Sequence, residues 1–202
     1  YWHHGNGVVP RLVAKNSKRK FWFVCNNCGQ EFDSTLSDVT NGSRCPYCSN
    51  PPQQLCQYDN CQQCHSKSFA SHPYAHHWHP TANSKLRPRD VFLNSGNKYW
   101  FVCNKCGHNF DSTLKHIVKS DSWCPYCANQ RLCQHDNCQQ CYSKSFAVYL
   151  YARYWHPTAN GTVTPKDVFL NCNSKFWFVC PDCEHPFDST LNNIVAGGSR
   201  CP

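Results

Sequence analysis

The chain has 202 residues with 20 Lys and Arg against 12 Asp and Glu, a formal net charge of +8, yet only 16% of its residues are charged. No stretch approaches the ~20 consecutive apolar residues of a membrane-spanning helix, so a spanning protein is excluded. Its 18 cysteines, about 9% of the chain, are typical of small modules held by cross-links or metal. We therefore expect several small modules and no single large core.

Three repeats follow one another along the chain. Trp2, Trp78 and Trp155 each open a unit, which gives steps of 76 and 77 residues. A fixed period of this kind predicts tandem structural repeats. The predicted boundaries place the three repeats, the last two with an inter-unit cysteine cluster, at residues 1–48, 49–127 and 128–202.

Each repeat contains a predicted β-hairpin. Aromatic and β-branched residues gather in a short segment that ends at the first cysteine of a pair, which favours a strand at 21–25, 99–103 and 176–180. An Asp-Ser-Thr centre bracketed by apolar residues follows, which predicts the return strand at 32–36, 110–114 and 187–191.

The sequence predicts one linker and two short helical segments between the hairpins. The proline-containing stretch 50–54 cannot continue a helix or a central strand, so it is interpreted as a linker. Over residues 143–155, Phe146, Leu150 and Tyr154 fall four apart, which predicts one helix. The counterpart in the preceding repeat carries Pro73, so we expect a helix there that is shorter or begins at that proline.

Cysteine spacing gives the strongest functional signal. Cys-x-x-Cys pairs are separated by 16 residues in the first repeat and by 17 in the second. Two intervening residues let a knuckle point both sulfurs at one ion, and two knuckles complete the tetrahedral environment of structural zinc. The predicted zinc ligands are Cys25, Cys28, Cys45, Cys48, Cys103, Cys106, Cys124 and Cys127. A secreted disulfide framework is the alternative, but knuckle pairs are poorly suited to bridging one another.

The third repeat shows the same pattern in Cys180, Cys183 and Cys201. The sequence begins at Tyr1 without an initiator Met and stops at Pro202, inside a motif that is complete in the other repeats. We interpret it as a piece of a longer chain and expect the fourth ligand just beyond Pro202.

A second cysteine cluster lies between repeats. Its two copies have identical spacing and comprise Cys56, Cys61, Cys64, Cys133, Cys138 and Cys141. We predict His79 and His156 as the fourth ligands because both recur fifteen residues after the last cysteine. Alternatively these histidines pack at a turn, and water, His72 or another chain completes the cluster.

Other histidines and one cysteine receive a structural interpretation. His108 and His185 align with Gln30, so we interpret them as packing or hydrogen-bonding residues. Cys172 aligns with serines in the other repeats and is interpreted as a spare thiol. The tryptophans of the first predicted strands are expected to fill the small cores behind the zinc, namely Trp22, Trp100 and Trp177.

The motifs of the third repeat carry a resemblance to a known family. The run from Trp155 to Gly161, then 164–168, then Lys175-Phe176-Trp177 before Cys180 resembles the probable zinc-ribbon (treble-clef-like) repeat family. The family occurs in bacteria, sometimes beside nuclease domains, and in tandem arrays in large DNA viruses of amoebae and algae.

The resemblance implies a fold and a viral origin. It implies small metal-stabilised modules, tandem treble-clef or zinc-ribbon repeats with short β-hairpins and short helices. The inserted cysteine segment followed by 67–73 is similar to the viral version. The first repeat departs at Gly5-Asn6-Gly7 and at Gln30, where the family has a longer turn and a histidine.

A chain of linked zinc modules could be an enzyme, a nucleic-acid-binding protein or a structural scaffold. Four thiolates saturate zinc and leave no position for an activated water, so we expect no enzyme. Nucleic-acid binding through basic residues and exposed aromatics is the alternative function. Its candidate residues are Lys18, Arg19, Lys20, Arg87 and Arg89. The basic run at 18–20 is not repeated in the other units, whereas cysteines and aromatics are.

The favoured interpretation is a structural and interaction scaffold of linked zinc modules. With the viral resemblance, this predicts a minor, capsid-associated component of a large DNA virus particle, located in the virion and assembled in the host cytoplasm, or otherwise intracellular. Its expected partners are other particle proteins, with weak nucleic-acid binding at most and no membrane span.

Overall fold

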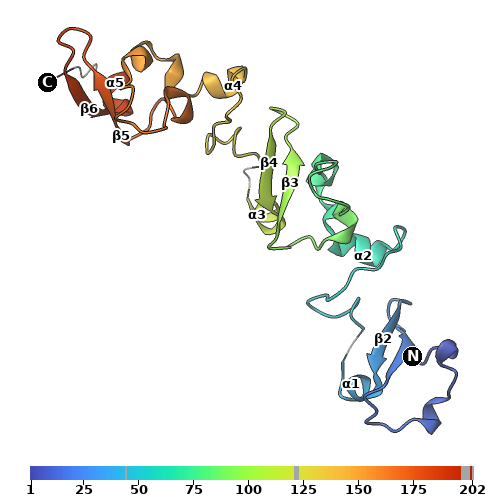
Figure 1. The fold of residues 1–202 in the computed structure, drawn as a ribbon. Coiled ribbons are helices and arrows are strands. Elements are labelled where there is room, and N and C mark those ends of the chain that lie inside the picture. The colour runs from blue at the N-terminus through green and yellow to red at the C-terminus, as the bar shows by residue number, and fades with distance from the viewer. Residues whose placement is uncertain (44, 121–122, 197–200, 202) are drawn as a thin grey trace. The chain divides into compact units, whose positions relative to one another are not determined.

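The computed structural model describes residues 1–43, 45–120, 123–196 and 201, and these fold into small hairpin-based modules (Figure 1). Each of three two-stranded antiparallel sheets belongs to one repeat. The strands are β1 Lys20–Val24, β2 Glu31–Thr35, β3 Lys98–Val102, β4 Asn109–Thr113, β5 Lys175–Val179 and β6 Pro186–Thr190. Contacts divide the chain into two compact units, residues 1–102 with 111–120 and the remainder. The predicted hairpins and the absence of one large core are confirmed.

The core of the first repeat forms on one face of its hairpin. In β1 the side chains alternate, so Phe21 and Phe23 are buried while Trp22 between them is 50% exposed. Phe23 pairs in register with Phe32, and their rings lie 5.7 Å apart. Trp2 packs on the same face, with its ring 4.9 Å from that of Phe21.

The strand tryptophans are therefore not core residues. Trp100 and Trp177 occupy the same position as Trp22 and are each 42% exposed. The prediction that these three fill the cores is wrong, because strand alternation directs them away from the flanking buried aromatics. The repeat-opening tryptophans supply the core contacts instead: Trp155 packs against Phe176 and Phe178 in the third repeat.

A short helix follows each hairpin: α1 Leu36–Thr40, α3 Leu114–Lys119 and α5 Leu191–Ala196. The threonine that ends the preceding strand begins the helix as its N-cap. Thr35 Oγ1 accepts a hydrogen bond from the Asp38 amide at 3.0 Å, and Thr113 Oγ1 accepts from the His116 amide at 3.2 Å. The repeated Asp-Ser-Thr segment thus terminates a strand and caps a helix.

The single helix predicted over 143–155 is broken into shorter pieces. The α-helix α4 ends at Tyr142, and two 3₁₀ turns follow at Phe146–Val148 and Leu150–Tyr154. Tyr149 between them is extended, with φ −82° and ψ 142°, so the 3.6-residue period cannot continue. In the preceding repeat a 3₁₀ turn begins at Pro73, as predicted.

The remaining short helices complete the connections between hairpins. They are η1 His4–Asn6, η2 Pro10–Leu12, α2 Gln62–Lys67, η3 Phe69–Ser71, η4 Pro73–His77, η5 Pro88–Asp90, α4 Gln139–Tyr142, η6 Phe146–Val148, η7 Leu150–Tyr154 and η8 Pro165–Asp167. Within the described ranges, no helix combines the length and the apolar character needed to cross a membrane.

An asparagine side chain holds the loop before each hairpin to the first strand of that hairpin. Asn83 is buried, and its Oδ1 accepts from the Trp100 amide while its Nδ2 donates to the Trp100 carbonyl, both at 2.8 Å. Asn6 and Asn160 make the same pair of bonds to Trp22 and Trp177. This two-bond arrangement holds the loop in register with the strand.

We expect Asn83→Ala to lower the free energy of unfolding by about 1–3 kcal/mol, because it leaves the Trp100 amide without its partner in a partly buried site. Denaturant unfolding of the zinc-loaded protein measures this loss. Asn97→Ala, an exposed position in the next loop, is the control and should change little. Equal stability of the two variants would contradict the proposed role of the amide.

Candidate metal centres

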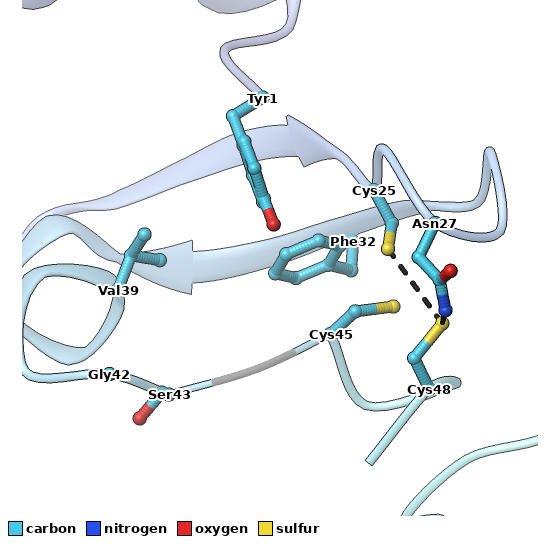
Figure 2. Close-up of a pocket in the computed structure, with 9 residues that line it drawn as sticks. All are labelled: Tyr1, Cys25, Asn27, Phe32, Val39, Gly42, Ser43, Cys45 and Cys48. Carbon is cyan, nitrogen blue, oxygen red and sulfur yellow. Dashed lines mark hydrogen bonds between the residues drawn. The ribbon is translucent and has the colours of Figure 1, made fainter.

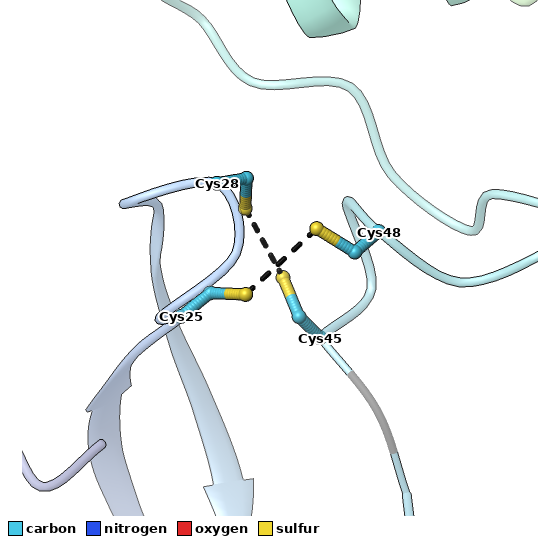
Figure 3. A group of neighbouring side chains, drawn as sticks. All are labelled: Cys25, Cys28, Cys45 and Cys48. Atoms are coloured by element: carbon cyan, nitrogen blue, oxygen red, sulfur yellow. Dashed lines mark hydrogen bonds between the residues drawn. The ribbon is translucent and has the colours of Figure 1, made fainter.

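The first four-cysteine group brings together two knuckles from separate parts of the first repeat. Figure 3 shows Cys25 and Cys28, from the loop after β1, facing Cys45 and Cys48, which follow α1. The Cys25 and Cys48 sulfurs are 3.8 Å apart, and those of Cys28 and Cys45 are 3.7 Å apart. Four bonds of ~2.3 Å to a tetrahedral zinc ion require sulfurs about 3.8 Å apart.

The second repeat reproduces this geometry. The sulfurs of Cys103 and Cys127 are 3.7 Å apart, and those of Cys106 and Cys124 are 3.6 Å apart. None of the cysteines that the structure describes is joined in a disulfide, and these sulfur separations exceed the ~2.0 Å of a disulfide bond. The arrangement matches a shared metal ion and not the disulfide alternative.

Backbone geometry shapes each first knuckle. Gly29 follows the pair with φ 71°, and its amide donates to the Cys25 carbonyl at 2.8 Å. Gly107 takes the same left-handed conformation with φ 69°, which glycine adopts without steric cost. Glu184 occupies this position in the third repeat with φ 60°, so that knuckle carries some backbone strain.

The environment separates the thiol pKa values within the first group. Burial raises the pKa of the Cys28 thiol. Burial also acts to raise that of Cys48, but hydrogen bonds from Cys28, Asn27 and Gln63 outweigh it and lower its pKa to about 7. Zinc binding requires thiolates, so it must displace protons from this group.

A hollow beside the first group offers little for catalysis. It is lined by Tyr1, Phe32, Val39 and the edge of the cysteine group (Figure 2). Asn27 and Ser43 supply its other polar side chains. Among the described residues that line it there is no carboxylate or imidazole, the usual general acids and bases.

The third repeat contributes a three-cysteine group. Cys180, Cys183 and Cys201 have sulfurs within 4.8 Å of one another, and those of Cys183 and Cys201 are 3.6 Å apart. Their arrangement matches three corners of the site seen in the other repeats. A fourth ligand beyond Pro202 stays a prediction.

The inter-unit cysteines also converge, but the predicted histidines do not join them. Cys133, Cys138 and Cys141 gather around His108, whose Nε2 lies 3.3 Å from the Cys138 sulfur and 3.6 Å from that of Cys141. The structure therefore places His108 beside these cysteines, in the position predicted for His156. His108 was interpreted as a packing or hydrogen-bonding residue, and its closeness to the three cysteines was not predicted.

The predicted ligands His79 and His156 cap turns. His79 Nδ1 accepts the amides of Thr81 and Ala82 at 3.3 and 3.1 Å, and His156 Nδ1 accepts the equivalent amides at the same distances. These histidines recur because their turn recurs. His72, the other candidate, likewise accepts the Tyr74 amide through Nδ1 at 3.3 Å.

The first inter-unit group has a different neighbourhood. Cys56, Cys61 and Cys64 converge, and the residue aligned with His108 is Gln30, whose Nε2 donates to the Cys61 sulfur at 3.4 Å. The buried Arg89 guanidinium donates to the Cys56 sulfur at 3.5 Å and to a backbone carbonyl at 2.9 Å. A cation in this position stabilises thiolate charge.

Several candidate nucleic-acid contacts already have protein partners. Arg89 faces the cysteine group, and Arg87 pairs with Asp59 at 3.2 Å and with Asp90 at 3.0 Å. Lys20 pairs across the hairpin with Asp33. Of the other two candidates, Lys18 is exposed, and the Arg19 guanidinium lies 5.5 Å from the Phe21 ring centroid.

Cys172 joins no metal group within the described part of the chain. Its sulfur accepts the Ser174 amide at 3.4 Å, as Ser17 and Ser95 hydroxyls accept the equivalent amides in the other repeats. The thiol thus substitutes for a turn-forming serine, which agrees with its interpretation as a spare thiol.

Comparison with known proteins supports the repeat assignment. A family profile described as a probable treble clef zinc finger domain matches residues 1–51, 74–130 and 151–202. Over 184 residues the chain is 32% identical to an uncharacterized protein of Acanthamoeba polyphaga mimivirus, covering 89% of this chain and 44% of that protein. The chain thus spans less than half the length of this relative. The three-cysteine inter-unit groups lie outside the family matches.

Proposed function

We propose, since the chain belongs to the probable treble clef zinc finger family, that it is a non-enzymatic scaffold whose zinc-bound repeats present protein-binding surfaces. The observation that carries the proposal is the pair of four-cysteine groups, Cys25 to Cys48 and Cys103 to Cys127, with tetrahedral sulfur spacing. Zinc bound at these groups would be held by four thiolates, and its binding energy would stabilise the folded repeats.

The same site chemistry argues against catalysis. Catalytic zinc keeps one position open for water or substrate, whereas four thiolates close the coordination shell. In the Asp-Ser-Thr segment, the side chains on either side of Ser34 have structural partners: Asp33 pairs with Lys20, and Thr35 caps α1. Neither contact supplies a base for the serine hydroxyl. A structural role for the repeats follows.

The outer face of each hairpin is the proposed protein-binding surface. It presents an exposed tryptophan beside a cross-strand ion pair, and the Lys–Asp separations are 2.8 Å for Lys20 and 2.9 Å for Lys98 and Lys175. Trp22 lies directly opposite Asp33 in the register. Each lysine on this face is neutralised by its aspartate partner, so the face offers little net positive charge to a phosphate and suits a protein partner better than a nucleic-acid backbone.

The partner is proposed from the viral relative. We place the chain in the particle of a large DNA virus, as a minor component associated with the capsid, where repeated exposed tryptophans contact other particle proteins. Support comes from the mimiviral relative and from the repeated Trp surface. Binding of genomic DNA is the alternative outcome of the test.

We expect the protein to remain with the protein shell when particles are opened and treated with nuclease. Replacing Trp22, Trp100 and Trp177 with Ala should remove it from particles, because each tryptophan supplies exposed aromatic area on the outer face of its hairpin. Immunoblots of shell and genome fractions measure both. The matched control replaces the exposed Lys18 and Arg19 with Ala and should retain incorporation.

Salt separates the two candidate functions. A protein contact of mainly apolar area should survive a rise from 50 to 200 mM salt, whereas binding through six or so phosphates would weaken by ~10³ or more. Release of the chain with the genome, together with loss of incorporation only in the Lys18 and Arg19 variant, would replace the scaffold by a DNA-binding function.

A further inference from the structure

We infer that His108, Cys133, Cys138 and Cys141 form a Cys3His zinc site that fastens the zinc knuckles of the second repeat to the segment entering the third. The inference rests on the proposed function in one respect, because it takes the metal to be zinc. Its three cysteines lie within residues 131–150, which no family match covers.

The donor set and its geometry fit zinc. The four ligand atoms lie within 4.8 Å of one another, and His108 Nε2 is 3.3 Å from the Cys138 sulfur and 3.6 Å from the Cys141 sulfur. Bonds of ~2.0–2.1 Å to nitrogen and ~2.3 Å to sulfur at tetrahedral angles give a nitrogen-to-sulfur separation of about 3.5 Å. The group is therefore already close to coordination geometry.

The imidazole is positioned by its own repeat. The His108 carbonyl accepts the Cys103 amide at 2.9 Å, which fixes the backbone at the end of the knuckle. Its ring stacks on Tyr126, with centroids 4.3 Å apart and planes at 20°, and Tyr126 lies between Cys124 and Cys127. Both knuckles of the four-cysteine site thus orient the nitrogen that faces the second cysteine group.

The cysteines are positioned by the following segment. Cys141 is buried in α4, and its sulfur accepts the Cys133 amide at 3.4 Å. Just beyond, Lys144 donates to the Tyr126 carbonyl at 2.8 Å, and Phe146 is fully buried in the core of the third repeat. An ion held by His108 and Cys141 would join the knuckles to a segment that is anchored in the next hairpin.

The equivalent junction between the first two repeats lacks the fourth ligand. Gln30 occupies the position of His108. Its amide nitrogen donates a hydrogen bond to the Cys61 sulfur and, as a donor, cannot bind a cation. Arg89 places a positive charge beside Cys56. The three thiols there would hold zinc with an open position and exchange it more readily, so the two junctions differ in metal dependence.

A reciprocal exchange of the two residues tests the inference. In the zinc-saturated 202-residue chain, His108→Gln should remove one zinc ion per chain after dialysis, and Gln30→His should add one firmly held ion. Elemental analysis gives the stoichiometry. Cobalt substitution gives a second readout, since exchanging imidazole for another ligand shifts the visible bands of tetrahedral cobalt. Proteolysis within 128–137 should increase in the His108 variant.

Two control variants test whether the change in zinc content is specific to His108 and Gln30. His156→Gln and His185→Gln should leave the metal count unchanged, because neither imidazole joins a described metal group. Unchanged zinc content in both exchange variants, with the four-cysteine sites still loaded, would overturn the Cys3His site alone. Absence of firmly bound zinc from the unaltered chain would overturn the scaffold proposal itself. If His108→Gln unfolds its repeat, the Gln30→His stoichiometry decides.

Discussion

Removing zinc with a chelator is expected to unfold the repeats. Each hairpin buries only a few aromatic side chains, such as Phe21, Phe23 and Phe32 in the first repeat, and such a core alone cannot sustain a fold of this size. Structural zinc contributes ~10–16 kcal/mol of apparent binding free energy, which is comparable to the whole stability of an ordinary domain at ~5–15 kcal/mol. Loss of the metal should therefore abolish the packed state.

Near-ultraviolet circular dichroism measures this loss through the aromatic packing of Trp2, Trp78 and Trp155. The signal should collapse when a chelator is added and return with zinc. Because thiolates must form before zinc binds, acid should produce the same collapse, and the fold should recover as the pH rises. A native spectrum from protein shown to contain no metal would contradict a zinc-dependent fold.

Two single cysteine substitutions test whether the fold depends on metal ligation. Cys103→Ser removes a buried ligand of the second repeat, so it should release that ion and unfold the hairpin. Cys172→Ser restores the hydroxyl that Ser17 and Ser95 supply at the equivalent turns and should leave zinc content and stability unchanged. Equal loss in both variants would indicate a general requirement for thiols and not metal ligation.

Much of the fold could be predicted because cysteine spacing and strand patterns are local signals. Each predicted strand lies within one residue of an observed one, as for β1 against 21–25 and β2 against 32–36. The helix predicted over 143–155 was wrong because a spacing of four is also compatible with successive 3₁₀ turns. Tyr149 interrupts them in an extended conformation, just as His72 does before Pro73.

The fourth ligand of the inter-unit cluster could not be found by recurrence. His79 and His156 recur because each accepts two backbone amides in a turn that has the same hydrogen bonds in both repeats. His108 faces a cysteine cluster, yet the aligned Gln30 faces one too, so comparison of repeats hides the difference in chemistry. The sequence offered one other signal, which was the position of these residues. Gln30 and His108 each come two residues after the second cysteine of a pair, and both contact the inter-unit cysteines that follow their repeat.

Strand alternation was the neglected signal for the tryptophans. A sequence of three consecutive aromatics cannot place all of them on one face of a two-stranded sheet. Phe176 and Phe178 share the face that Trp155 covers, so Trp177 must point the other way. The same alternation separates residues that stabilise a hairpin from the residue that remains available to a partner.

Substitutions at adjacent positions of β5 should therefore destabilise the hairpin to very different extents. Phe178 is fully buried and contacts Phe146, Trp155 and Phe187, so Phe178→Ala should cost about 3–5 kcal/mol, enough to unfold the third hairpin. Trp177 is 42% exposed and holds its strand through backbone bonds to Asn160, which any side chain permits. Trp177→Ala should cost about 1 kcal/mol or less.

Hydrogen exchange resolved by mass spectrometry distinguishes the two effects within one repeat. Amides of 175–190 should lose protection in Phe178→Ala and keep it in Trp177→Ala, while amides of the first hairpin at 20–35 stay protected in both, because each hairpin has its own core. If the outer face binds a particle protein as proposed, incorporation into particles should fall in Trp177→Ala although its hairpin stays folded. Equal loss of protection in the two variants would make Trp177 a core residue and remove it from the proposed binding surface.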